Sequence, residues 1–156
     1  MKQLDILLSE YGESHMNLTN KLIHWVCVPL IMFSLFIMLF SIPFFMTRTF
    51  LTSWAMVVLI LALIYYARLS AIMFAGFAVI GVLMLAGITE LYEWSDYNAG
   101  RLALWGFIIF IAAWIGQFIG HKIEGKKPSF TQDIQFLLIG PAWLMSYIFR
   151  KMGIAY

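Results

Sequence analysis

Long apolar runs alternate with short polar breaks along most of the chain. The runs cover residues 25–46, 49–67, 69–89 and 102–120, and each holds 19 to 22 residues without a charged side chain. About 20 such residues let a helix cross the roughly 30 Å hydrocarbon core of a bilayer. Because the breaks are short, sequential helices must be antiparallel neighbours. The pattern therefore predicts an all-α, polytopic membrane protein built as an antiparallel four-helix transmembrane bundle.

The N-terminal residues 2–13 follow a different pattern. Asp5, Glu10 and Glu13 lie off a stripe of apolar side chains at helical spacing, which holds Leu4, Leu7, Leu8 and Tyr11. This pattern predicts an amphipathic helix lying on the membrane or on the bundle. The acidic residues also interrupt the apolar stretch that a cleavable signal peptide requires, so no signal peptide is expected.

The last apolar segment, residues 134–149, is only 16 residues long and has Gly140 and Pro141 near its middle. Proline removes a backbone donor and disfavours helix at the residue before it. We therefore expect a re-entrant or interfacial helical hairpin here, with a fifth span as the alternative.

Composition agrees with a membrane protein. The 156 residues form one domain, residues 1–156, that is 63% hydrophobic and only 12% charged, whereas soluble domains are about a quarter charged. The mean hydropathy is +0.89. A net charge of +2 is too small to indicate nucleic acid as a partner. The single cysteine, Cys27, excludes an intrachain disulfide and is expected to pack within its span.

The basic residues give an orientation. With four spans, Arg48 and Arg101 lie on one side, and the other side holds Lys2, Lys21, Arg68, Lys122, Lys126, Lys127, Arg150 and Lys151. The richer side faces the cytoplasm, so both termini are expected there. A fifth span would weaken this asymmetry without reversing it.

All three histidines fall on one membrane face in this topology. His15 and His24 lie at the start of the first span, and His121 follows the fourth, which returns the chain to its starting side. His15 and His24 are nine residues apart, on opposite sides of an unbroken helix, so they converge only if the chain turns near residues 14–19. Asn17 and Thr19 favour helix starts and lie in that interval.

Three neutral imidazoles, or two with a carboxylate, suit iron(II) or zinc. Asn20 is four residues before His24, and Gln117, His121 and Glu124 share one helical face if the fourth helix continues past Gly120. Asn20, Gln117 or Glu124 could therefore serve as an additional ligand or orient a histidine ring.

Other polar and aromatic residues have simpler explanations. Glu90, Glu93 and Asp96 fit a solvated loop between residues 90 and 101 on the opposite face. The lysines that follow His121 fit contacts with anionic lipid; they are Lys122, Lys126 and Lys127. The tryptophans fit an interfacial belt; they include Trp25, Trp94 and Trp143.

Three polar motifs resemble those of the 2-hydroxy fatty acid dioxygenase family. Residues 15–24, His-Met-Asn-Leu-Thr-Asn-Lys-Leu-Ile-His, followed by Pro29, resemble its N-terminal signature. Residues 114–128, Trp-Ile-Gly-Gln-Phe-Ile-Gly-His-Lys-Ile-Glu-Gly-Lys-Lys-Pro, resemble the second signature. Residues 137–141, Leu-Leu-Ile-Gly-Pro, resemble the third. The resemblance covers nearly the whole chain in the right order.

This resemblance implies an Fe(II)-dependent enzyme that uses O2 to shorten 2-hydroxy fatty acids by one carbon, in fatty acid α-oxidation. A 2-hydroxy carboxylate can chelate iron through its carboxylate and hydroxyl oxygens, with O2 taking a third position. His15, His24 and His121 match the family histidines expected to hold iron and to be catalytic. Asn20 and Glu124 match polar positions of its motifs.

The family acts in fungal phytosphingosine breakdown at the endoplasmic reticulum. The compact length of this chain resembles a bacterial-type member, for which the inner membrane is expected instead. Two other functions fit the histidines alone. One is a bis-histidine haem electron carrier, and the other is a non-enzymatic scaffold or transporter with interfacial histidines. An oligomer is compatible with all three functions.

Overall fold

The computed structural model describes residues 3–126 and 135–156, and these residues are helical apart from their loops. Six helices lie within them. They are α1 (Gln3–Glu13), α2 (Leu18–Ser41), α3 (Trp54–Leu69), α4 (Ala71–Trp94), α5 (Ala99–Glu124) and α6 (Phe136–Lys151). No strand occurs in the described ranges, so the all-α prediction is confirmed.

Three helices, α2, α4 and α5, are long and apolar enough to cross a membrane. Only 22% to 28% of the residues in their most apolar stretches are buried inside the protein. Their outer faces carry large apolar side chains such as Leu83, which is 65% exposed. Apolar surface on this scale is expected to face lipid rather than water. Length and composition therefore indicate a membrane protein.

The predicted span over residues 49–67 is wrong at its N-terminal end. Helix α3 starts only at Trp54, because Ser53 caps it by accepting a hydrogen bond from Met56 N at 3.3 Å. Before it, the hydroxyl oxygens of Thr49 and Thr52 lie 2.6 Å apart and hold a loop. With 16 residues α3 is about 24 Å long. It falls short of the length needed to span, so a fourth crossing stays a prediction.

The other three predicted spans are helical, but their ends differ from the predicted bounds. Helix α2 begins at Leu18 rather than residue 25 and ends at Ser41, before Pro43. Helix α4 runs on to Trp94, so Glu90 and Glu93 are exposed residues of its last turns and not part of a loop. The connection to α5 is correspondingly short. Within it, Asp96 pairs with Arg101 at 2.8 Å.

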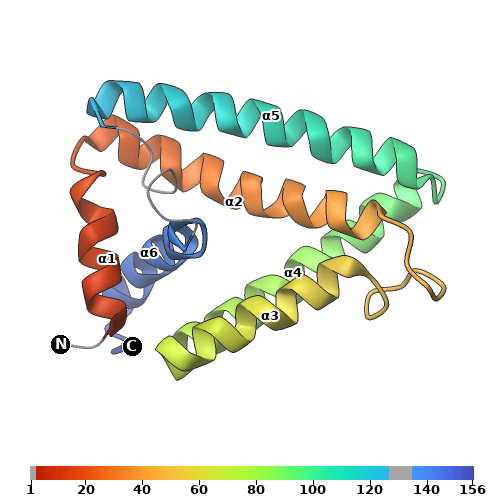
Figure 1. The fold of residues 1–156 in the computed structure, drawn as a ribbon, viewed down its shortest axis with the longest axis horizontal. Helices are drawn as coiled ribbons and strands as arrows, with labels where there is room; N and C mark the ends of the chain where they lie inside the picture. Colours follow the sequence, from red (N-terminus) through yellow and green to blue (C-terminus); the bar gives the residue numbers. More distant parts are fainter. Residues whose placement is uncertain (1–2, 127–134) are drawn as a thin grey trace.

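The most extensive helix–helix contact in the fold is the packing of α2 against α5 (Figure 1). A Cβ added to Gly106 of α5 would lie 2.7 Å from Ile37 Cγ2. One added to Gly116 would lie 2.6 Å from Cys27 Sγ, so the buried cysteine has the expected packing role. Small residues at such positions let two apolar helices approach closely. The α2–α5 pair is therefore antiparallel and tight, with the start of α2 beside the end of α5.

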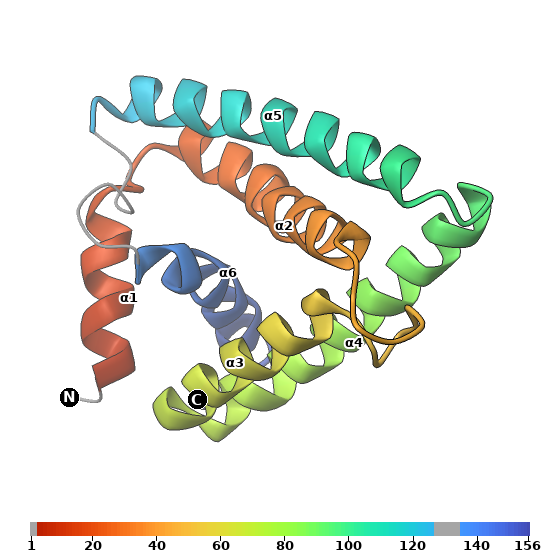
Figure 2. The ribbon, with the colours of Figure 1, turned by 45° about the vertical axis from the view of Figure 1, so that its right-hand side comes forward.

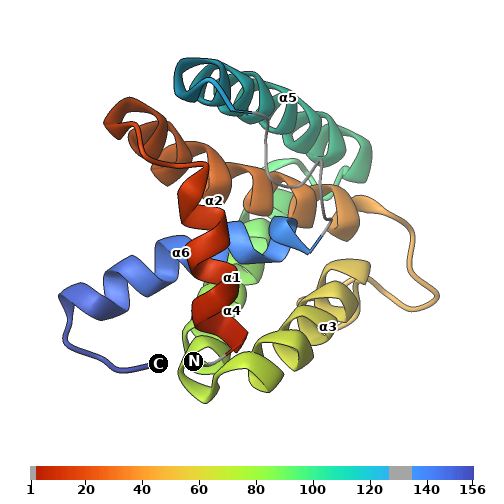
Figure 3. The ribbon, with the colours of Figure 1, turned by 60° about the vertical axis from the view of Figure 1, so that its left-hand side comes forward.

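The α3–α4 hairpin diverges from this pair, and α6 lies between them (Figures 1 and 2). Helix α1 crosses over α6 (Figure 3) and packs on it through Leu4, Leu8 and Tyr11, which are buried. The amphipathic helix expected at the N-terminus is thus confirmed. Its apolar stripe packs against protein.

The hairpin predicted over residues 134–149 is wrong where the structure describes it; residue 134 lies outside the described residues. Helix α6 passes through Gly140 and Pro141 without interruption. Both residues are buried, and Gly140 lies so close to Tyr11 that an added Cβ would be 2.9 Å from its hydroxyl oxygen. Burial against α1 outweighs the local cost of the proline.

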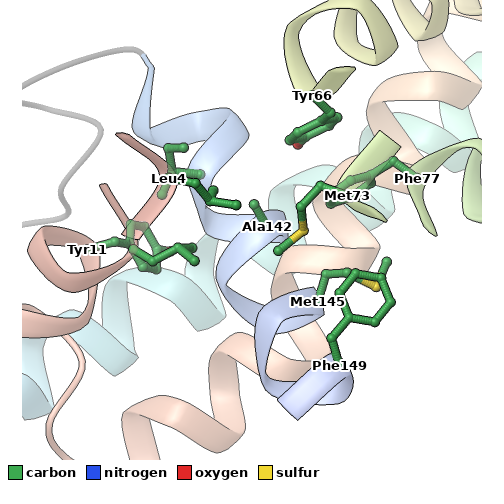
Figure 4. Packing of buried hydrophobic residues seen from close by; sticks show 10 residues of the cluster. Leu4, Tyr11, Tyr66, Met73, Phe77, Ala142, Met145 and Phe149 are labelled. Carbon is green, nitrogen blue, oxygen red and sulfur yellow. The ribbon is translucent and has the colours of Figure 1, made fainter. Parts of the chain in front are cut away.

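The two larger clusters of buried side chains occupy opposite ends of the described structure. The first surrounds α6 and joins it to α1 and to the α3–α4 hairpin (Figure 4); its members include Leu4, Tyr11, Tyr66, Met73, Phe77, Ala142, Met145 and Phe149. The second joins α2 to α3, α4 and α5; it consists of Phe36, Ile37, Phe40, Ala55, Leu59, Leu85, Ile88 and Leu102. The space between α2 and the hairpin is therefore closed by packing at one end.

We predict that the α2–α5 contact does not tolerate a methyl group. Gly106→Ala should lower the free energy of unfolding by about 1–3 kcal/mol, because Ile37 must be displaced. Gly87→Ala is the matched control, since the nearest atom to its added Cβ is 3.9 Å away. That change should stabilise α4 by about 0.5–1 kcal/mol. Denaturation in detergent measures both, and equal effects would contradict the packing.

Candidate metal centre

Three histidines from three elements meet at the end of the α2–α5 pair. His15 lies in the connection between α1 and α2, His24 in the second turn of α2, and His121 in the last turn of α5. All three are buried, with 1%, 1% and 5% of their surface exposed. One ring nitrogen from each lies within 4.8 Å of the other two. The predicted convergence of the histidines is confirmed.

The break required between His15 and His24 is present. Helix α1 ends at Glu13 and α2 begins at Leu18, after the N-cap Asn17. The Asn17 side chain accepts hydrogen bonds from Thr19 N at 2.8 Å and Asn20 N at 3.4 Å. This cap satisfies donors at the start of α2, and the turn before it directs His15 back towards His24.

Glu124 holds this turn. Its carboxylate accepts hydrogen bonds from Met16 N at 2.8 Å, Asn17 N at 2.9 Å and Asn20 Nδ2 at 2.9 Å. Helix α5, the predicted fourth span, continues past Gly120 as expected. It ends at Glu124, and its C-cap Gly125 has a left-handed conformation with φ of 72°. Glu124 and Asn20 therefore fix the position of His15, and both oxygens of the Glu124 carboxylate are occupied in doing so.

Backbone carbonyls fix the tautomers of two histidines. His15 Nδ1 lies 2.6 Å from Tyr11 O, and His24 Nδ1 lies 2.9 Å from Asn20 O. A carbonyl oxygen can only accept, so both Nδ1 atoms carry the proton and both neutral rings present a lone pair at Nε2. These two Nε2 atoms face each other at 2.9 Å. Two lone pairs at this distance repel unless a cation lies between them.

A metal ion fits this requirement better than a proton. Burial lowers the pKa of His15 to about 4, so its ring is neutral at physiological pH. The Nε2 atoms of His15 and His24 lie 2.9 Å apart, close enough for one ion with metal–nitrogen bonds of about 2.1 Å to contact both. His121 adds a third donor, and its buried Nδ1 has no hydrogen-bond partner within the described part of the chain. Three neutral imidazoles suit Fe(II) or Zn(II).

Two aromatic residues that the sequence did not assign to the site surround His15. The Tyr11 ring stacks on the His15 ring with centroids 4.2 Å apart and planes 13° apart. The Trp143 ring lies 5.4 Å from the His15 ring, which brings α6 to the histidines. The four-residue spacing of Tyr11 and His15 could have indicated this contact. No sequence signal indicates the approach of Trp143, which was expected in an interfacial belt with Trp25 and Trp94.

The lysines after His121 differ in their surroundings. Lys122 is exposed, as expected for a contact with lipid, and nothing in its surroundings assigns it another role. Lys126 Nζ donates to Glu13 O at 2.6 Å and so ties the end of α5 to the end of α1. Lys127 lies outside the described residues.

A cavity of about 220 Å³ opens from the histidines into the protein. Its polar end contains His24, His121 and Gln117, and Tyr11 also contributes to its wall. Gln117 is buried and lines the cavity, and its side chain makes no hydrogen bond to another described residue. The rest of the wall is almost entirely apolar and comes from α2, α3, α4, α5 and α6. An amphipathic molecule with a polar head and a long apolar tail matches this lining.

We predict that Glu124→Gln loosens the site. The amide retains one acceptor oxygen where the carboxylate has two, so the free energy of unfolding should fall by about 1–3 kcal/mol. Metal affinity should fall by about 10–100-fold, as for other groups that position ligands. Glu93→Gln, at an exposed position on α4, is the control and should change neither quantity. Denaturation and metal titration measure the two effects, and a Glu124→Gln protein with normal affinity would contradict this role.

Comparison with known families identifies the chain. Searches of curated proteins and of solved structures gave no match. One family model, described as 2-hydroxy-palmitic acid dioxygenase Mpo1-like, matches residues 1–152. The match includes all three histidines, Asn20 and Glu124 and covers nearly the whole chain, so this protein belongs to the Mpo1-like family.

Proposed function

We propose that this protein is a membrane-embedded, Fe(II)-dependent dioxygenase that shortens 2-hydroxy fatty acids by one carbon. The observation that carries the proposal is the pair of buried Nε2 atoms of His15 and His24, 2.9 Å apart, with His121 beside them at the polar end of an apolar cavity. The family description names 2-hydroxy-palmitic acid as a substrate, and the cavity suits such a molecule. The reaction belongs to fatty acid α-oxidation and lipid catabolism.

His15, His24 and His121 would hold the iron. A bound Fe(II) would supply Lewis acidity, and it would bring O2 and the 2-hydroxy carboxylate together at its open positions. The protein fixes the two facing rings through the carbonyls of Tyr11 and Asn20, so the nitrogens need little rearrangement to bind metal. The Tyr11 and Trp143 rings cover His15 and keep water from that side of the cluster.

Gln117 is placed to orient the substrate head. It lies one helical turn before His121 and shares the polar end of the cavity with it. Its carboxamide can donate to a carboxylate or a 2-hydroxyl oxygen, and it has no competing partner within the described residues. The apolar wall beyond it then takes the acyl tail. Gln117 thus acts on substrate, whereas Asn20 and Glu124 act on the position of the histidines.

The membrane location follows from the exposed apolar faces of α2, α4 and α5. A fatty acid in the bilayer could then reach the cavity without entering water. The excess of basic residues near the histidines supports a cytoplasmic orientation for this end and for both termini. The membrane would be the inner membrane in a bacterium and the endoplasmic reticulum in a eukaryote.

The facing pair of His15 and His24 does not fit the haem alternative. Axial ligands bind opposite faces of a haem, which separates their nitrogens by about 4 Å, twice a metal–nitrogen bond. The Nε2 atoms of His15 and His24 lie only 2.9 Å apart, with no room for a macrocycle between them. A non-enzymatic scaffold would not require two facing lone pairs in a buried site.

We predict that each histidine is needed for iron. His15→Ala, His24→Ala and His121→Ala should each lose iron and lower turnover by more than the roughly 100-fold typical of groups that only position ligands. Iron analysis and oxygen consumption with 2-hydroxypalmitic acid measure the two effects. Glu93→Ala is the control and should keep both. Iron and turnover retained in all three variants would refute the proposal, whereas iron without turnover in the wild type would refute only the substrate.

Gln117→Leu should separate substrate binding from metal binding. Removing a hydrogen bond to a charged head should raise KM by about 10–100-fold, equivalent to about 1.5–3 kcal/mol. Iron content should stay at the wild-type value, because the histidines keep their own partners. Gln117→Asn retains the carboxamide on a shorter side chain, so its KM should lie between those of the wild type and of Gln117→Leu. A KM for Gln117→Leu equal to the wild-type value would exclude this role.

A further inference from the structure

We infer that the cavity limits the length of the substrate's acyl chain, and that Phe36, Leu59 and Met84 at its closed end set the longest chain accepted. The inference rests on the proposed function for the position of the head at the histidines. It adds a determinant of chain length that lies far from the metal cluster, on α2, α3 and α4.

The direction of the cavity follows from its lining. At the polar end the wall is made by His24, His121 and Gln117. The wall then continues along α2 as Val28, Ile31, Met32, Leu35 and Phe36. Beyond His24, the part of the wall that α2 contributes therefore consists of apolar side chains. This matches a fatty acid whose carboxylate stays at the histidines.

The far end is closed by packing. Phe36 and Leu59 line the cavity and also belong to the second buried cluster, which fills the space beyond them. Leu59 packs against α4 so closely that a Cβ added to Gly81 would clash with its Cδ1 atom. Neither α3 nor α4 can therefore move inward at this level, and a longer chain would have to displace core side chains.

The level of the closed end can be placed along α2. From His24 to Phe36 is twelve residues of α2, or about 18 Å at 1.5 Å per residue. An acyl chain with its head at the histidines would therefore meet the packed side chains about three helical turns (~18 Å) further along α2, and a longer chain would have to displace them.

Met84 offers the clearest way to shorten the cavity. It lines the cavity from α4 and is only half-buried, so a larger side chain can be placed there with little cost to the core. The neighbouring Leu83 points to the outside of the protein and is 65% exposed. The same substitution at these two adjacent positions therefore separates a change in the cavity from a change on the lipid-facing surface.

The first test is the chain-length profile of purified enzyme, measured with 2-hydroxy acids of increasing length. Met84→Trp should shift the preferred substrate to shorter chains by at least about two carbons, because the ring fills the far end. Leu59→Ala should shift it to longer chains, and Leu83→Trp should leave it unchanged. Leu59→Ala weakens the core, so the paired tryptophan variants decide the result. Identical profiles for Met84→Trp and Leu83→Trp would overturn the inference.

The second test does not depend on turnover or on iron. A 2-hydroxypalmitic acid with a diazirine at its terminal carbon is bound to the full-length protein and activated by light. Cross-links should form at Phe36, Leu59 and Met84, and Met84→Trp should abolish them. Cross-links confined to lipid-facing residues such as Leu83 would overturn the inference. Cross-links at the closed end in a protein that never consumes oxygen would refute the proposed reaction and leave the acyl site standing.

Discussion

The candidate site depends on one carboxylate at the end of α5. Glu124 accepts hydrogen bonds from two backbone donors and one side-chain donor at the turn between α1 and α2. Hydrogen bonds to a charged acceptor are stronger than neutral ones, and a turn held by three of them has little freedom. The turn carries His15, the helix it starts carries His24, and α5 itself carries His121. A single charged group thus joins all three histidines.

Much of this arrangement could be predicted from the sequence because it depends on local pattern. The apolar runs indicated long helices, and the nine-residue interval between His15 and His24 required the turn that Asn17 caps. The errors in α3 and α6 arose where non-local packing or local polar hydrogen bonds decided the outcome. Helix α3 is shorter than its uncharged run because Thr49, Thr52 and Ser53 form a loop and a cap. Helix α6 continues through Pro141 because α1 buries it.

The roles of individual polar residues were harder to assign. Spacing placed Gln117 and Glu124 on the helical face of His121, and it left both of them, with Asn20, as candidates for an additional ligand or for orienting a histidine ring. In the structure Gln117 lines the cavity, whereas Glu124 binds the turn of another element. The position of Trp143 beside His15 depends on how α6 docks, and no pattern within its own segment encodes that docking. Side-chain partners across elements need the fold, even when their residues are known.

The composition of the histidine cluster has a consequence for charge. The three candidate ligands are imidazoles, and within the described residues the carboxylate that binds the turn, Glu124, has both oxygens engaged in hydrogen bonds there. A divalent cation held there keeps its full positive charge in a region of low polarity, which is costly until an anion approaches. A fatty acid brings one negative charge with its head, whereas its ester or alcohol brings none. Charge neutralisation by the substrate itself would thus select free acids over the far more abundant esterified lipids around them.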